Sequence, residues 1–301
     1  MSDGLLVGFD FGGTKLSITL ADRSGSSVSG DVLPTLADEG AEQAVRRAIA
    51  SAQGLLADRA AVAVGVGVAT MGVTHRDHVE LAPNVPGWGR LALPSMLDEA
   101  FAPAPVSIAN DVKAAAVAEL TWGELRGVDT GIYLNLGTGI AAALVVGGAV
   151  LEGAHGASGE IGYWTRSRAD LTGAAEGRAP LEEYVGGSGV QRRARKELGV
   201  DGGVSGLTGL ETPAARAFLD DLYAEIAVHT ANLAIAVDPE RVVVGGGYAR
   251  GSGSVIEAIR ARLDAFVPYP PELRVAAFGA DAGSAGAVAL AMAAVSRQRP
   301  R

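Results

Sequence analysis

The feature that most constrains the fold of this chain is a strand–glycine turn–strand pattern that occurs twice. Residues 5–11 (LLVGFDF) form an apolar run, Gly12-Gly13-Thr14 follows, and residues 16–20 then alternate apolar and polar side chains. Residues 131–136, the turn Gly137-Thr138-Gly139 and residues 140–146 repeat this arrangement. Such runs around a glycine turn predict β-hairpins. Each turn therefore joins two strands, whereas a P-loop or a Rossmann glycine loop opens a helix.

Similar elements are predicted after each hairpin. In the first half these are strands at 27–33, 62–68 and 106–109 and helices at 39–56, after 93 and at 111–122. In the second half they are a strand into 151, an irregular glycine-rich stretch at 153–210, helices at 214–237, after 253 and from 284, and strands at 241–244 and 273–278. Both halves have the order βββαβαβα.

The repeated order predicts a duplicated α/β protein with a central cleft between two lobes. The expected N-terminal lobe is residues 1–110, joined by the C-terminal helix 284–301. The expected C-terminal lobe is residues 111–283, with an insertion at 153–210. A chain of 301 residues is long enough for two such lobes.

Composition excludes several classes of function. Acidic residues number 34 against 25 basic ones, a net charge of −9, which argues against nucleic-acid binding. The chain has no cysteine, so disulfides, thiolate zinc sites and a cysteine nucleophile are excluded. The N-terminus lacks a basic signal region and the longest clean apolar run, residues 140–151, is too short to cross a bilayer. We therefore expect a cytoplasmic protein that does not bind membranes.

The paired glycine turns indicate phosphate binding. Glycine lets backbone N–H groups approach oxygen atoms that a Cβ would keep away, and Thr14 and Thr138 add hydroxyl donors. A single glycine turn is weak evidence, because glycine is common in turns of every kind. Two matched turns favour a polyphosphate ligand.

Further motifs follow in a fixed order along almost the whole chain. They are Asp10-Phe11-Gly12-Gly13-Thr14-Lys15, Ala82-Pro83-Asn84-Val85-Pro86-Gly87-Trp88, Asn110-Asp111, Leu136-Gly137-Thr138-Gly139-Ile140, Gly159-Glu160-Ile161-Gly162, Asp238-Pro239, Val244-Gly245-Gly246-Gly247 and Asp281-Ala282-Gly283. In this combination the chain resembles the ROK family of bacterial sugar kinases. The resemblance implies an actin-like (ribonuclease H-like) fold that binds ATP and Mg²⁺.

The resemblance also implies a donor site. Asp10 would orient Mg²⁺ through water, although a strand-end acid can also simply cap a tight turn. The residues placed near ATP are Gly12, Gly13, Thr14 and Lys15 of the first turn, Gly137, Thr138 and Gly139 of the second, and Gly245, Gly246 and Gly247 on the adenosine side.

For the acceptor, the resemblance assigns Asp111 as the general base. Its alternative is an acid favoured by the positive end of a helix. The residues expected to contact sugar hydroxyls are Asn84, Asn110, Asp111, Glu160 and Glu182, with Tyr163 and His155 as further contacts. His75 and His78 are expected in a solvated loop, and His229 in the core. None of the four histidines forms an H-E-x-x-H pair.

The chain departs from the family pattern in three places, of which the first two bear on specificity. Tyr163 replaces a histidine, and residues 165–181 lack the cysteines that bind structural zinc in the family, so no zinc is expected. Lys113 occupies a position where asparagine is common. Cysteine-free relatives include polyphosphate-using glucokinases and kinases of sugar-like C7 cyclitols.

The primary hypothesis is an ATP-dependent kinase that phosphorylates a primary hydroxyl of a hexose or a hexose-like C7 cyclitol. The alternatives are a polyphosphate-dependent glucokinase, a catalytically silent sugar sensor of the ROK type, and an actin-like or chaperone ATPase that acts on a protein. We expect the chain to form a homodimer.

Overall fold

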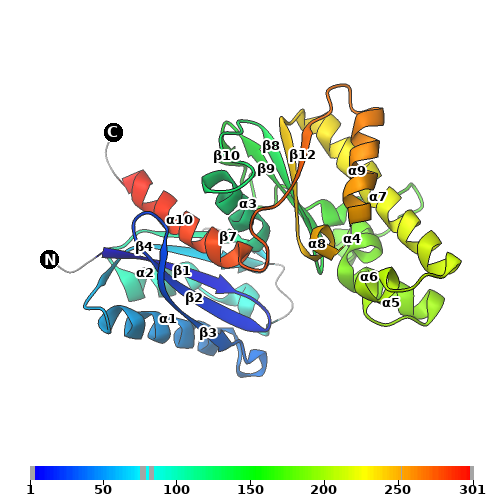
Figure 1. Ribbon diagram of the computed structural model, residues 1–301. Helices are drawn as coiled ribbons and strands as arrows, with labels where there is room; N and C mark the ends of the chain where they lie inside the picture. The colour runs from blue at the N-terminus through cyan, green and yellow to red at the C-terminus, as the bar shows by residue number, and fades with distance from the viewer. Residues whose placement is uncertain (1–3, 75–78, 81–84, 252, 299–301) are drawn as a thin grey trace. The chain divides into compact units, whose positions relative to one another are not determined.

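The computed structural model describes residues 4–74, 79–80, 85–251 and 253–298 (Figure 1). These residues divide into two compact units. The first comprises Met1–Trp122, Glu152–Ala157 and Ala280–Arg301, and the second comprises Gly123–Leu151 and Ser158–Gly279. The sequence placed the start of the second lobe at residue 111. Helix α3 (Asp111–Thr121) groups with the first unit because it packs against α10 (Ala282–Gln298).

The sheet of the first unit has the order β3-β2-β1-β4-β7. Its strands are β1 (Gly4–Phe11), β2 (Lys15–Ala21), β3 (Ser27–Pro34), β4 (Val62–Thr70) and β7 (Val106–Asn110). β2 runs antiparallel to β1 and β3, whereas β4 and β7 continue the sheet in parallel. The carboxyl ends of the parallel strands thus meet at one edge, which is where ligand sites form in such sheets.

Helices cover both faces of this sheet with different packing. One face packs against α1 (Ala41–Ala57) and α2 (Leu93–Phe101), through a core that includes Phe9, Phe11 and Trp88. The other face packs against α3 and α10 through small residues. A Cβ on Gly67 of β4 would lie 1.9 Å from the carbonyl oxygen of Ala287, so glycine lets α10 lie directly against the sheet.

The second unit repeats the same topology. Its sheet has the order β10-β9-β8-β11-β12, formed by β8 (Gly131–Leu136), β9 (Ile140–Val146), β10 (Ala149–Val150), β11 (Arg241–Gly245) and β12 (Glu272–Val275). β9 is antiparallel to β8 and β10, and β11 and β12 are parallel additions. The fold is therefore the duplicated α/β arrangement that the two hairpins predicted.

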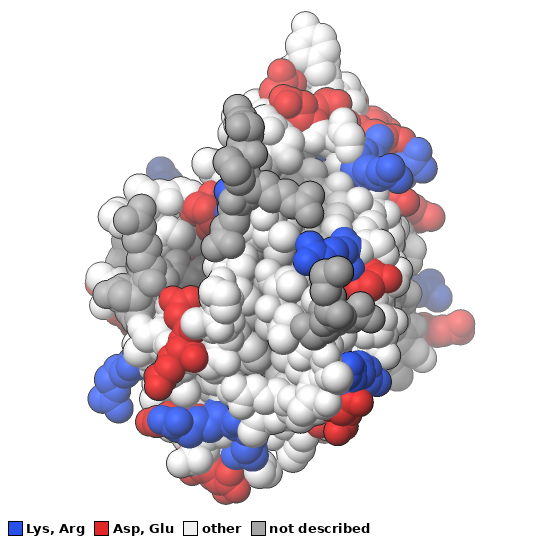
Figure 2. Space-filling view, turned by 90° about the vertical axis from the view of Figure 1, so that its left-hand side faces the viewer, with Lys and Arg blue, Asp and Glu red and all other residues white. Residues whose placement is uncertain are grey.

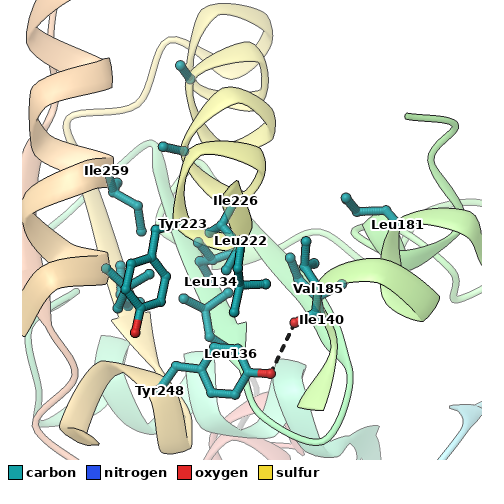
Figure 3. Close-up of a cluster of buried hydrophobic side chains, with 14 of the residues drawn as sticks. Leu134, Leu136, Ile140, Leu181, Val185, Leu222, Tyr223, Ile226, Tyr248 and Ile259 are labelled. Atoms are coloured by element: carbon teal, nitrogen blue, oxygen red, sulfur yellow. Dashed lines mark hydrogen bonds between the residues drawn. The ribbon is translucent and has the colours of Figure 1, made fainter. Parts of the chain in front are cut away.

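The core of the second unit lies between its sheet and the long helix α7 (Pro213–Val237), which packs against α9 (Gly253–Phe266). Figure 3 shows Leu222 and Ile226 of α7 close to Leu134 of the sheet, and Tyr223 of α7 on the side of Ile259 of α9. The buried hydroxyl of Tyr248 donates a hydrogen bond of 3.1 Å to the carbonyl of Val185, which satisfies the one polar group that this aromatic side chain brings into the core.

The prediction of an irregular stretch at 153–210 was wrong for its second half. It contains α4 (Pro180–Val185), α5 (Gly187–Leu198) and α6 (Gly203–Thr208). Glycine at the first position of α5 and α6 lowers intrinsic helix propensity there, and burial of Leu181, Val190 and Leu207 in the core outweighs it. β12 ends at Val275, earlier than the predicted strand, and α1 begins at Ala41, after a short 3₁₀ turn (Ala37–Glu39). A two-residue pair, β5 (Val73–Thr74) with β6 (Val79–Glu80), is additional.

No helix in the described part of the chain is both long and apolar enough to cross a membrane. On the face that Figure 2 displays, acidic and basic side chains are interspersed among uncharged ones and form no broad field of one sign.

Candidate active site

The first glycine turn is fixed by hydrogen bonds to its backbone and is exposed to solvent at its tip. The N–H of Gly12 donates to the carbonyl of Lys15 at 3.0 Å, which closes the turn between β1 and β2. Thr35 is buried and makes two hydrogen bonds to the turn. Its backbone N–H donates to the carbonyl of Thr14 at 3.0 Å, and its hydroxyl donates to the carbonyl of Gly12 at 2.7 Å. Gly13, Thr14 and Lys15 are exposed. The turn therefore presents these three residues to solvent on a fixed backbone.

Asp10 is the penultimate residue of β1, close to this turn. Burial raises the pKa of its carboxyl, the neighbouring charge of Asp111 raises it further, and Lys15 lowers it. A Cβ on Gly283 in the first turn of α10 would lie 2.5 Å from an oxygen of this carboxylate. A methyl group at position 283 would therefore displace the Asp10 carboxylate, a contact that was not predicted from the sequence.

Asp111 begins α3 at the carboxyl end of β7. Asn110 is the N-cap of this helix, because its side-chain oxygen accepts the N–H of Lys113 at 2.8 Å. The Asp111 carboxylate accepts the N–H of Val112 at 2.9 Å. Its side chain is accessible to solvent, yet the protein around it raises the pKa by desolvation, against the lowering effect of backbone N–H groups. A carboxylate that solvent can reach and whose pKa is raised is suited to accept a proton.

The second glycine turn differs in its support. The N–H of Gly137 donates to the carbonyl of Gly139, and the first N–H groups of α5, from Gly187 and Ser188, donate to the carbonyls of Gly137 and Thr138, each at 3.0 Å. Thr138 remains exposed. A helix N-terminus therefore fixes this turn, where a threonine fixes the first.

Glu182 of α4 lies directly under the second turn. One of its carboxylate oxygens accepts the N–H of Ile140 at 3.2 Å, and a Cβ on Gly139 would lie 2.2 Å from the same oxygen. The charges of Glu160 and Glu182 both raise the pKa of Tyr163, after desolvation as the main cause. The structure thus brings three of the predicted acceptor residues together within the second unit: Glu160, Tyr163 and Glu182.

A pocket of about 400 Å³ adjoins the second turn. It is lined by Gly137, Thr138, Gly187, Ser188, Gln191, Gly202, Gly203, Val204, Ser205, Thr208, Gly247, Tyr248 and Gly251. Among the described residues that line it, three are predicted nucleotide-binding residues and none is charged. The lining residues on α5 and α6 were not predicted from the sequence, although the run Gly186-Gly187-Ser188-Gly189 indicates close backbone approach.

The glycine run after β11 approaches the second hairpin closely. Gly246 has φ +87°, and a Cβ there would lie 2.3 Å from the carbonyl oxygen of Leu136. A Cβ on Gly245 would lie 2.1 Å from the hydroxyl of Tyr133. These two glycines set the spacing between β11 and β8, and Gly247, which lines the pocket, is left exposed.

The remaining predicted residues fall elsewhere. Asn84, His75 and His78 lie outside the described residues. His155 is exposed in the segment Glu152–Ala157 of the first unit. His229 is buried, with Nε2 3.5 Å from Glu225 and its ring 5.8 Å from that of Trp164, which agrees with the predicted core position.

The segment that would carry the family's zinc ligands contains a different set of contacts. The guanidinium groups of Arg166 and Arg193 lie 3.1 and 3.6 Å from the ring centroid of Tyr184, whose hydroxyl donates to Asp221 at 2.6 Å. Arg166 also pairs with Glu225 at 2.6 Å. Among the described residues no group of three or more histidine, aspartate or glutamate side chains could hold a metal ion. These stacked and paired side chains connect this segment to α5 and α7.

Two sheets of identical order, each with a glycine turn in its leading hairpin, define the actin-like α/β fold of ATPases and sugar kinases. The chain belongs to the ROK family, whose model matches residues 6–294. It is 29% identical to a glucokinase of Halalkalibacterium halodurans, over 95% of this chain and 94% of the relative. It is also 29% identical to a kanosamine kinase of Amycolatopsis mediterranei, over 95% of each.

Solved structures show the same similarity. A ROK hexokinase from Thermus thermophilus superposes with a TM-score of 0.85 at 29% identity, covering 97% of this chain and 99% of the other. A ROK glucokinase from Streptomyces griseus, in complex with glucose and AMPPNP, gives 0.74 at 25% identity and covers 96% and 99%. The resemblance to the ROK family is confirmed, and the relatives support a sugar kinase.

Proposed function

We propose that this protein is an ATP-dependent kinase that phosphorylates a primary hydroxyl of a hexose or a hexose-like C7 cyclitol, with Asp111 as the general base. The observation that carries the proposal is the division of chemistry between the units. The strand-end carboxylates Asp10 and Asp111 lie in the first unit, and an uncharged pocket beside a glycine turn lies in the second.

The pocket favours a nucleoside over a polyphosphate chain. The described residues that line it are glycine, valine, tyrosine and residues with neutral polar side chains, which suit an apolar base and a ribose. A polyphosphate carries charge along its whole length and is typically held by arginine and lysine. In ATP only the phosphates need such neutralisation, and we assign them to the two glycine turns, with Lys15 beside the first.

The strand-end carboxylates fit a magnesium ion. Mg²⁺ prefers carboxylate and water oxygens, and the mutual repulsion of Asp10 and Asp111 is the situation that a cation relieves. When bound, Mg²⁺ neutralises charge on the transferred phosphoryl group. Asp10 would hold it through water, while Gly283 keeps the carboxylate in place.

The acceptor role rests on the proton chemistry of Asp111. Its raised pKa brings a carboxylate closer to the range in which it can take a proton from a hydroxyl. Asn110 caps the helix through its side-chain oxygen, next to Asp111, and we assign it to a substrate hydroxyl. Glu160, Glu182 and Tyr163 would bind further hydroxyls, and the two carboxylates would equally hold a ring amino group.

The proposal is tested by measuring ADP release with ATP and Mg²⁺ over a panel of acceptors. The panel contains glucose, mannose, kanosamine, N-acetyl sugars, fructose and C7 cyclitols, and inorganic polyphosphate replaces ATP in a parallel series. We expect turnover that depends on one acceptor class and on ATP. Turnover with polyphosphate alone would contradict the donor assignment.

The other hypotheses give different results in the same assay. Saturable acceptor binding without ADP release, across the panel, would identify a silent sensor. ATP hydrolysis that no sugar or cyclitol stimulates would identify an ATPase that acts on a macromolecule. Either result would reject the kinase.

A further inference from the structure

The residue that the proposed mechanism leaves unused is Lys113. It lies in the first turn of α3 and only 1% of it is exposed to solvent. Its ammonium group donates to the carbonyl oxygens of Gly156 and Glu152 at 2.5 and 3.0 Å, and lies 3.3 Å from a carboxylate oxygen of Glu152. An ammonium group has three protons to donate, so these three acceptors compensate the burial of the charge.

All three acceptors belong to one short segment, Glu152–Ala157. This segment groups with the first unit, whereas the chain before it, Gly123–Leu151, and after it, from Ser158, belongs to the second. Gly153 and Gly156 have φ +79° and +70°, and the N–H of Gly156 contacts the carbonyl of Gly153 at 3.5 Å. These turns allow the carbonyl groups of both Glu152 and Gly156 to accept hydrogen bonds from the ammonium group of Lys113.

The chain is fixed again three residues later. Gly159, at φ +84°, accepts the N–H of Ala142 of β9 at 2.8 Å, and a Cβ there would lie 1.9 Å from the carbonyl oxygen of Ala142. Glu160 follows directly. Since extended chain spans at most roughly 3.6 Å per residue, the two residues between Gly156 and Gly159 leave little slack. The contacts of Lys113 therefore restrict the path of the chain that leads to Glu160.

We propose that Lys113 is a positioning residue of the kinase: from the helix that begins with Asp111, it anchors the segment leading to Glu160 and so determines how the acceptor is held. Residues two apart on a helix do not share a face, so Lys113 acts through this segment and not on the carboxylate of Asp111. The inference rests on the proposed function and adds a specificity determinant to it.

The test replaces Lys113 with methionine, which keeps the length of the side chain and removes the donors. The wild-type protein is first assayed with the acceptor panel, so that failure of the proposed function is seen separately. Lys113→Met is then expected to raise the acceptor KM by about tenfold or more, because small displacements of positioned groups have large effects, and to leave the ATP KM within about twofold. Lys196→Met, the same change at an exposed site of α5, is expected to match wild type.

Two further variants separate positioning from general stability. Inserting one glycine between Ala157 and Ser158 keeps the contacts of Lys113 but lengthens the tether, and should raise the acceptor KM alone. Glu152→Gln keeps both carbonyl contacts and should change each KM by less than about twofold. An unchanged acceptor KM in the glycine-insertion variant would overturn the proposal, whether or not Lys113→Met folds. Equal rises in both KM values in Lys113→Met would overturn it as well.

Discussion

The two glycine turns share a topology but differ in what surrounds them. The turn at Gly12 is supported by a buried threonine and follows Asp10, whose carboxylate faces Gly283. The turn at Gly139 is supported by the start of α5 and lies over Glu182. In each unit the absence of a Cβ on one glycine leaves room for one carboxylate. A Cβ on Gly283 would lie 2.5 Å from an oxygen of Asp10, and a Cβ on Gly139 would lie 2.2 Å from an oxygen of Glu182.

The two units therefore share one arrangement of strands but place different chemical groups around it. The sheets keep the same order and direction of strands. The first unit places two carboxylates at the ends of its parallel strands, and the second adds α4, α5 and α6, which form a glutamate site and an uncharged pocket. Substitutions in each unit should show whether the two halves have separate roles.

The largest effect is expected from Asp111→Asn. The amide cannot accept a proton, so kcat should fall by roughly 10²- to 10⁴-fold, with smaller changes in acceptor binding. Initial rates of ADP release at saturating substrate measure it. Asp98→Asn, at an exposed acid of α2, is the matched control and should behave as wild type. Near wild-type turnover of Asp111→Asn would remove this residue from the role of base.

Alanine at each of the two carboxylate-facing glycines should separate the units. Gly283→Ala displaces Asp10, and we expect kcat to fall by about tenfold or more with the acceptor KM little changed. Gly139→Ala displaces Glu182, and we expect the acceptor KM to rise by a similar factor. Gly54→Ala in α1 is the control, since open space surrounds its added methyl, and it should be neutral or stabilising by about 0.5–1 kcal/mol. Identical kinetic effects of the first two variants would break the comparison.

The pH dependence of stability should also differ between wild type and Asp111→Asn. The pKa values of Asp10 and Asp111 are raised in the folded state, so folding is opposed by their charges above those pKa values. Protonation removes this cost as the pH falls from the pKa of the folded state towards 3.8, the ordinary pKa of an aspartate side chain. Asp111→Asn should therefore be the more stable protein at neutral pH, and the difference should shrink on acidification. Urea unfolding at several pH values tests this, and a difference that grows on acidification would contradict it.

The smallest effect is expected behind the first turn. Thr35→Val removes the hydroxyl that donates to Gly12 but keeps the buried shape, and should cost about 1–3 kcal/mol because the carbonyl is left without that partner. Ser188→Ala at the second turn leaves its supporting N–H in place and should cost less than about 0.5 kcal/mol. Thermal unfolding of both variants measures the difference. Equal losses would show that the turns are supported alike.

Local sequence pattern was enough to predict the leading hairpin of each sheet. Apolar runs, alternation and glycine turns predicted β1, β2, β8 and β9 within a residue or two, because hairpins are encoded by neighbouring residues. α4 to α6 were missed because glycine-rich helices of this kind are stabilised by tertiary burial, which a local pattern does not contain.

Site residues that belong to a sequence motif could be selected from the sequence, whereas contacts between segments far apart in the chain could not be predicted. Asp10, Asp111 and both turns could be singled out from the sequence. The close approach of Gly283 to Asp10 and the burial of Lys113 against Gly156 depend on segments far apart in the chain. Glu182 could be aligned, but its place beneath Gly139 could not be predicted from spacing.

The most direct test of the account is calorimetric titration of AMPPNP into wild type, Asp111→Asn and Ser205→Trp. Ser205 is an exposed residue of α6 that lines the uncharged pocket, so tryptophan there should fill the pocket without disturbing the core. The account predicts that Asp111→Asn binds AMPPNP within about threefold of wild type, and that Ser205→Trp binds at least about tenfold more weakly. Wild-type affinity in Ser205→Trp would contradict the claim that the second unit holds the nucleotide in this pocket.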